Sequence, residues 1–79
     1  MKTIIILGIN ADIGKNIAYF FNNDGYRVIG TYRKKKSLYN KDIDMYKCDI
    51  TKKNDIKKFI SSLKKKKIKW DIIFSSIGT

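Results

Sequence analysis

The feature that most constrains the fold is an apolar run that leads directly into a glycine-containing turn near the start of the chain. Residues 3–7 (Thr-Ile-Ile-Ile-Leu) form the run, the turn extends from Gly8 to Gly14, and an amphipathic segment follows at once. A strand, turn and helix in this order direct the unpaired N–H groups of the helix N-terminus at whatever lies beyond the strand. The group that most often lies there is a pyrophosphate.

Hydrophobic periodicity along the chain predicts alternating strands and helices. Strands are expected at about 3–7, 27–32, 45–48 and 71–75, and helices at about 13–23 and 52–66. We expect Gly25 at the left-handed position after the first helix and Thr51 at the N-cap of the second. Residues 33–44 are polar and predict a loop or one short helix. This alternation predicts an α/β fold: half of a doubly wound parallel sheet, Rossmann-like, with strand order 3-2-1-4.

Apolar spacing within the predicted elements indicates which faces are buried. The first strand is apolar on both faces, as expected for a central parallel strand covered by helices on both sides. Each predicted helix carries apolar residues that share one face. They are Ile13, Ile17, Phe20 and Phe21 in the first helix, and Ile56, Phe59, Ile60 and Leu63 in the second.

Composition excludes several classes of site. The 79 residues contain no histidine, no glutamate and one cysteine, Cys48, which excludes an internal disulfide, a structural zinc site and a histidine relay. The single cysteine fits a reducing compartment, so a cytoplasmic location is expected. No apolar run approaches the ~18 residues of a membrane span. The net charge is +11, but 16 of the 18 basic residues are lysine, which favours a solvated surface over a nucleic-acid partner.

The order and spacing of these elements resemble the N-terminal part of a short-chain dehydrogenase/reductase, a family with an NAD(P)-binding Rossmann fold. The family turn reads Thr-Gly-x-x-x-Gly-x-Gly in its classical branch and Gly-x-x-Gly-x-x-Gly in its extended branch. Gly8 and Gly14 supply the outer glycines of both, and Ala11 or Asp12 stands at the middle position. The resemblance implies that the turn borders the cofactor through Gly8, Asn10, Asp12, Ile13 and Gly14. The alternative is a turn that only connects a strand to a helix.

The end of the second predicted strand indicates the kind of dinucleotide. An NAD site needs an acidic residue about 20 residues beyond the glycines to bind the ribose 2′-hydroxyl. Here Arg33 lies 19 residues after Gly14, and no acid occurs between Asp24 and Asp42. In the family, a basic residue at this position implies that NADP(H) is preferred over NAD(H). The alternative is that Arg33 is one more surface cation.

Two further segments match the family in position. The segment 48–51 (Cys-Asp-Ile-Thr) resembles the family's Asp-Val-Thr/Ser, where the aspartate binds the adenine amino group and the next backbone borders the ring. These roles would go to Asp49 and Ile50, unless Asp49 merely helps Thr51 cap the second helix. Near the end of the sequence, Ser76 and Gly78 match the family's Asn-Asn-Ala-Gly in position, and only the glycine is identical.

These matches imply the cofactor-binding N-terminal segment of an NADP(H)-dependent oxidoreductase acting on a carbonyl or alcohol. Residues 1–79 are expected to form one incomplete domain that binds a dinucleotide, with a small-molecule substrate only in a complete enzyme. The family's catalytic Ser and Tyr-x-x-x-Lys have no counterpart; Tyr32 and Lys36 have the spacing by chance. Alternatives are a segment of an extended-type sugar-nucleotide epimerase or dehydratase, or a non-catalytic nucleotide-binding module. Self-association through the apolar fourth strand is also expected.

Overall fold

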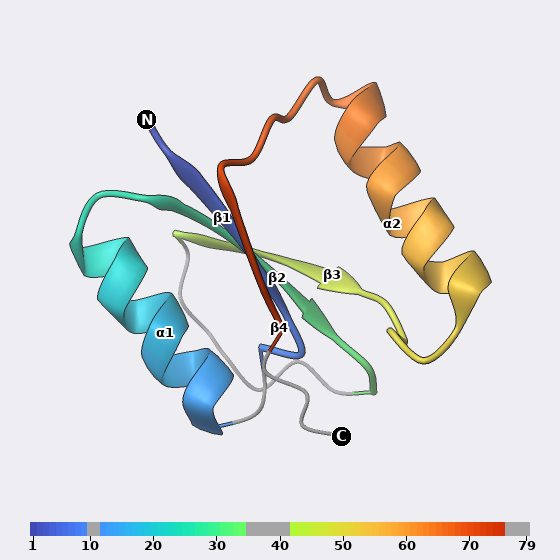
Figure 1. Ribbon diagram of the computed structural model, residues 1–79, viewed down its shortest axis with the longest axis horizontal. Helices are drawn as coiled ribbons and strands as arrows, with labels where there is room; N and C mark the ends of the chain where they lie inside the picture. The colour runs from blue at the N-terminus through green and yellow to red at the C-terminus, as the bar shows by residue number, and fades with distance from the viewer. Residues whose placement is uncertain (10–11, 35–41, 76–79) are drawn as a thin grey trace.

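The computed structural model describes residues 1–9, 12–34 and 42–75, which form one sheet with a helix on each face (Figure 1). The elements are β1 (Thr3–Leu7), α1 (Asp12–Asn23), β2 (Arg27–Tyr32), β3 (Ile43–Lys47), α2 (Lys53–Lys65) and β4 (Ile72–Ser75). All strand pairs are parallel, and the order across the sheet is β3-β2-β1-β4. The predicted α/β class and strand order are confirmed.

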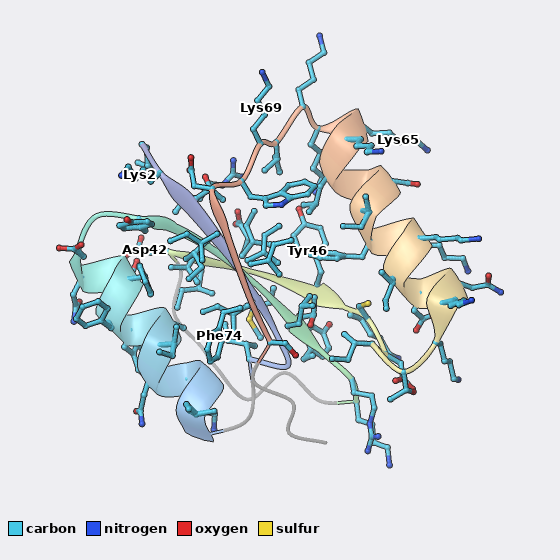
Figure 2. The ribbon with its side chains drawn as sticks, in the orientation of Figure 1. Lys2, Asp42, Tyr46, Lys65, Lys69 and Phe74 are labelled. Carbon is cyan, nitrogen blue, oxygen red and sulfur yellow. The ribbon has the colours of Figure 1, made fainter. Side chains whose placement is uncertain are left out.

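Successive residues of β1 enter opposite halves of the core. Ile4 and Ile6 pack on the α1 side and Ile5 on the α2 side, and all three are at most 1% exposed. The buried members of the α1-side cluster are Ile4, Ile6, Ile9, Ala18, Val28 and Ile43. Those of the α2-side cluster are Ile5, Ile29, Cys48, Phe59, Leu63 and Ile68. Side chains fill both layers between sheet and helices (Figure 2), so the predicted burial of both faces of β1 is confirmed.

The buried stripe of α1 differs from the predicted one. Ile17 and Phe21 pack against the α1-side cluster as expected. Ile13 and Phe20 are 55% and 64% exposed, so their predicted burial is wrong. Each lies one residue before a member of the stripe formed by Gly14, Ile17, Ala18 and Phe21. One residue turns a helix by about 100°, which is enough to carry both side chains out of the interface.

Gly25 follows α1 in the left-handed conformation that the sequence predicts. Gly25 has φ +85°, in the left-handed region, and the N–H of Tyr26 donates to the carbonyl of Phe21 at 2.9 Å. This bond ties the residue after the glycine back to the last turn of the helix. The chain can therefore turn directly into β2.

β3 begins at Ile43, two residues before the predicted start, and ends at Lys47. The polar Asp44 obscured this start in the sequence. In the structure the Arg27 guanidinium on β2 donates to the Asp44 carboxylate from two nitrogens, at 3.3 and 3.0 Å. Ile43, 5% exposed, lies opposite Val28 and extends the apolar face of the sheet. An ion pair on an edge strand therefore accommodates the charge.

β4 forms an edge of the sheet next to β1. Asp71 links the two strands at their start: its carboxylate accepts from the N–H of Thr3, and its own N–H donates to the Thr3 carbonyl, both at 2.9 Å. Ile72 and Ile73 are 37% and 50% exposed. Self-association through this strand stays a prediction. In the described ranges, neither helix has the length and apolarity to cross a membrane.

Candidate functional site

All four strands run in the same direction, so their carboxyl ends meet at one edge of the sheet (Figure 1). β1 leads there into Gly8, whose φ of +78° is a conformation that residues other than glycine rarely adopt. Ile9 follows and is fully buried, and α1 begins at Asp12. The predicted strand, glycine turn and helix therefore form, with the α1 N-terminus at the carboxyl edge.

Thr31 on β2 holds this turn in place. Its side-chain Oγ1 accepts a hydrogen bond from the N–H of Gly8 at 3.0 Å, and its carbonyl accepts one from the N–H of Ile9 at 2.9 Å. Thr31 is fully buried. The sequence analysis missed this residue. The available signal is a hydroxyl side chain inside an otherwise apolar strand, because a buried hydroxyl needs a hydrogen-bond partner.

We expect Thr31→Val to destabilise the protein by about 1–3 kcal/mol, because the near-isosteric valine cannot accept the hydrogen bond from Gly8. The free energy of unfolding in urea measures this effect. Thr31→Ser is the matched control, since it keeps the hydroxyl and loses only a methyl group. If the valine variant were as stable as the native chain and the serine variant weaker, packing rather than the hydrogen bond would fix the turn.

A pocket at the carboxyl ends of β2 and β3 brings together Arg33 and Asp49, which lie 16 residues apart in the sequence. Its volume is about 380 Å³, within the usual range for small-ligand sites. Lys34, Lys47, Lys52 and Asp55 complete the lining. Arg33 is exposed, so its guanidinium is accessible to a ligand. The first two residues were predicted at this site; the other four were not.

The loop from β3 to α2 fixes the position of Asp49. Its Oδ1 accepts hydrogen bonds from the N–H of Thr51 at 3.0 Å and from the Thr51 hydroxyl at 2.6 Å. These two bonds, with smaller effects of Lys52 and Arg33, lower the pKa of Asp49 below its usual value. The carboxylate is therefore ionised at neutral pH. Its second oxygen, Oδ2, makes no hydrogen bond within the described residues and remains able to accept one from a ligand.

The predicted N-cap role of Thr51 is wrong. Lys52 occupies the N-cap of α2 and makes no side-chain capping bond. The hydroxyl of Thr51 donates to Asp49 instead, and Asp55 in the first turn of α2 accepts from the N–H of Asp49 at 3.0 Å. The Asp49–Thr51 pairing thus organises the loop before α2 rather than capping the helix.

The remaining predicted site residues are distributed as follows. Gly14 is buried in the first turn of α1, where Ile13 is exposed. Ile50 packs against the α2-side cluster, beside the buried Cys48. Burial, with the charges of Asp55 and Asp49 nearby, raises the pKa of the Cys48 thiol, which therefore stays neutral. Asn10, Ser76 and Gly78 lie outside the described residues, as does Lys36. No cluster of potential metal ligands occurs in the described part of the chain.

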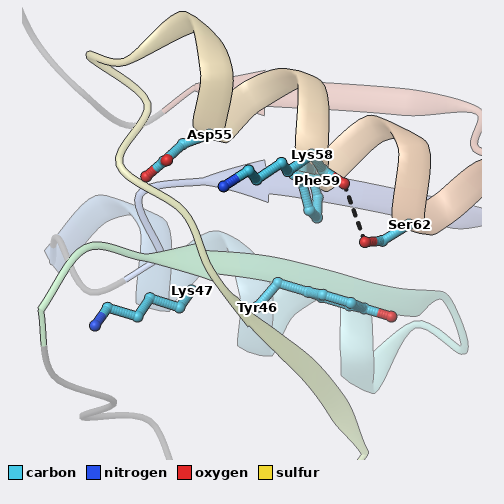
Figure 3. A pocket seen from close by; sticks show the side chains of 6 residues that line it. All are labelled: Tyr46, Lys47, Asp55, Lys58, Phe59 and Ser62. Carbon is cyan, nitrogen blue, oxygen red and sulfur yellow. Dashed lines mark hydrogen bonds between the residues drawn. The ribbon is translucent and has the colours of Figure 1, made fainter.

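A second, smaller pocket of about 280 Å³ lies between β3 and α2. Figure 3 shows Lys47 and Asp55 at one end of it and Tyr46 and Ser62 at the other. The dashed line marks the hydrogen bond that the Ser62 hydroxyl donates to the carbonyl of Lys58, at 3.0 Å. Lys47 and Asp55 line both pockets, so the two hollows adjoin.

Solved structures with the same fold include short-chain dehydrogenases. One, from Leptospira borgpetersenii serovar Hardjo-bovis with bound NAD+, has a TM-score of 0.88 at 24% identity and matches 99% of this chain. A 4-hydroxyisoleucine dehydrogenase complexed with NADH has a TM-score of 0.89 at 21% identity over the whole chain. A short-chain dehydrogenase family protein from Francisella tularensis has a TM-score of 0.82 at 25% identity and matches 99%.

This chain spans 32%, 35% and 31% of those three proteins, respectively. A search of curated proteins found no match. The family model described as enoyl-(acyl carrier protein) reductase matches residues 8–79, from the glycine turn to the last residue of the sequence. With this match added to the parallel β3-β2-β1-β4 sheet and its glycine turn, the chain belongs to the short-chain dehydrogenase family.

Proposed function

We propose that residues 1–79 are the first, cofactor-binding part of a short-chain oxidoreductase that prefers NADP(H) over NAD(H). The observation that carries the proposal is the pocket that joins Arg33 to Asp49 at the carboxyl edge of the sheet. It lies at the same edge as the β1–α1 turn, where a helix N-terminus favours a pyrophosphate. These features together fit the adenosine half of a nicotinamide dinucleotide.

Each group in the proposed site has a separate task. The turn from Gly8 to Gly14, through Asn10, Asp12 and Ile13, would border the pyrophosphate. The free Oδ2 of Asp49 would accept from the adenine amino group, and Ile50 would border the ring. Arg33 would bind the 2′-phosphate, because a guanidinium matches the geometry of a phosphate group. Ser76 and Gly78 would also contribute to this site, as their match to the family motif implies.

The choice between the two dinucleotides rests on the end of β2. The structures from Leptospira and of 4-hydroxyisoleucine dehydrogenase contain NAD+ and NADH, which supports a nicotinamide dinucleotide here. A 2′-hydroxyl is normally bound by an acid at this point, whereas this chain carries Arg33 and Lys34. In a complete enzyme, a hydride would pass between the nicotinamide and a carbonyl or alcohol carbon.

We expect Arg33→Ala to weaken NADPH binding by about 1.5–3 kcal/mol, the usual effect of losing a hydrogen bond to a charged group, and to leave NADH binding nearly unchanged. Titration calorimetry of the 79-residue chain with each cofactor measures both effects. Arg27→Ala is the matched control, because Arg27 is the other arginine and pairs with Asp44 at the opposite end of β2. Equal losses for NADPH and NADH would remove Arg33 from the 2′-phosphate site and contradict the proposed preference.

A further inference from the structure

Four cations from three separate segments converge on the pocket beside Asp49. Arg33 and Lys34 follow β2, Lys47 ends β3, and Lys52 immediately precedes α2. All four are exposed. Within the described residues, none of their side chains makes a hydrogen bond or an ion pair. Only Arg33 was selected from the sequence; Lys34 is its neighbour in the chain, and the fold brings Lys47 and Lys52 to the same pocket.

The two carboxylates in the same pocket do not neutralise these cations by direct pairing. Oδ1 of Asp49 is bonded to Thr51, and Oδ2 of Asp55 accepts from the backbone N–H of Asp49. Four positive and two negative side chains leave the pocket with an excess of positive charge. A dianionic phosphate monoester is the ligand chemistry that such an excess favours.

We infer that Lys47 and Lys52 act with Arg33 and Lys34 to hold the phosphate monoester at the ribose 2′-position. This inference rests on the proposed function, and it adds two specificity-determining residues to it. Lys47 and Asp55 lie at the same end of the adjoining pocket (Figure 3), which places the end of β3 beside the start of α2. The end of β3 and the start of α2 thus complete a phosphate site that the end of β2 begins.

Adenosine 2′,5′-bisphosphate and AMP are the probes, because they differ only in the 2′-phosphate. We expect the 79-residue chain to bind the bisphosphate more tightly than AMP. Lys47→Gln and Lys52→Gln should each reduce that preference by about 3- to 5-fold, and the double variant by about 10- to 25-fold, as expected for exposed charge pairs. Inorganic phosphate is titrated separately, and it should compete with the bisphosphate only weakly, since it lacks the adenosine.

The double variant Lys65→Gln/Lys69→Gln is the matched control. It removes the same charge at the far end of α2 and beyond it (Figure 2), away from the pocket, and should keep the native preference. If the chain prefers the bisphosphate and both double variants keep that preference, Lys47 and Lys52 take no part in binding. The inference then fails, while the proposed function stands. If both double variants lose it equally, the effect is general surface charge and the inference also fails. If the native chain shows no preference, the proposed NADP(H) specificity fails as well.

Discussion

Replacing Gly8 with valine is expected to abolish dinucleotide binding, a loss of more than about 100-fold in affinity or roughly 2.7 kcal/mol. Gly8 has φ +78°, and a β-branched residue is a true outlier in that region. The turn lies between β1 and the N-terminus of α1, where the backbone would closely approach the pyrophosphate of the proposed site. A valine side chain would occupy that space. Titration with NADPH and with NADH, followed by fluorescence or calorimetry, measures the loss.

Gly25→Val is the control that separates steric exclusion from backbone strain. Gly25 also has a positive φ, +85°, but an added Cβ there meets no atom within 4 Å. It lies between α1 and β2, at the opposite end of α1 from the glycine turn. Both variants should lose stability through strain, yet only the Gly8 variant should lose affinity. The milder Gly8→Ala serves if the valine variant unfolds. A folded Gly8 variant with native affinity would mean that the turn is only a connector.

Most of the fold could be predicted because it depends on patterns local to each segment. The apolar run of β1 and the glycine after α1 indicate their structures without reference to distant residues. The start of β3 could not be predicted, because aspartate is unfavourable in strands and the sequence does not show that Arg27 pairs with Asp44 across the sheet. The predicted buried face of α1 was wrong in part for a related reason. Several apolar residues lie close together there, and the sheet selects Ile17 and Phe21 over Ile13 and Phe20.

The candidate site likewise contains residues that could be predicted from the sequence and residues that could not. Arg33 and Asp49 could be selected because each follows a predicted strand, and parallel strands end at one edge. Thr31 was missed: its hydroxyl signals that a hydrogen bond is needed, but only the fold shows that the partner is the N–H of Gly8 on another segment. Lys47 and Lys52 are two of 16 lysines, and nothing in their sequence context separates them from the others. Their convergence is a property of the folded sheet.

Adding a single methyl group at Gly30 is expected to have the largest effect on stability. An alanine Cβ there would lie 2.3 Å from Ile9 Cδ1 and 2.9 Å from Ile9 Cβ, both closer than the contacts that Cβ atoms make in proteins. Gly30 lies on β2 opposite Ile6, and Ile9 is fully buried, so neither residue has free space into which to move. We expect Gly30→Ala to cost about 3 kcal/mol, the upper end of the usual range for overpacking. That is most of the stability of roughly 3–5 kcal/mol that a core of this size provides.

A double-mutant cycle in urea identifies the clash as the cause. Ile9→Val removes the Cδ1 atom that lies nearest, so it should recover about 1 kcal/mol when combined with Gly30→Ala, a coupling typical of residues in contact. Ile68→Val is the matched control, since Ile68 is buried in the cluster on the other face of the sheet. Its effect should simply add to that of Gly30→Ala. Additive effects for both pairs would show that the contact with Ile9 Cδ1 is not the cause of the loss. An alanine variant as stable as the native chain would show that β2 tolerates a side chain here. The close approach of the β1–α1 turn to β2 would then not depend on glycine.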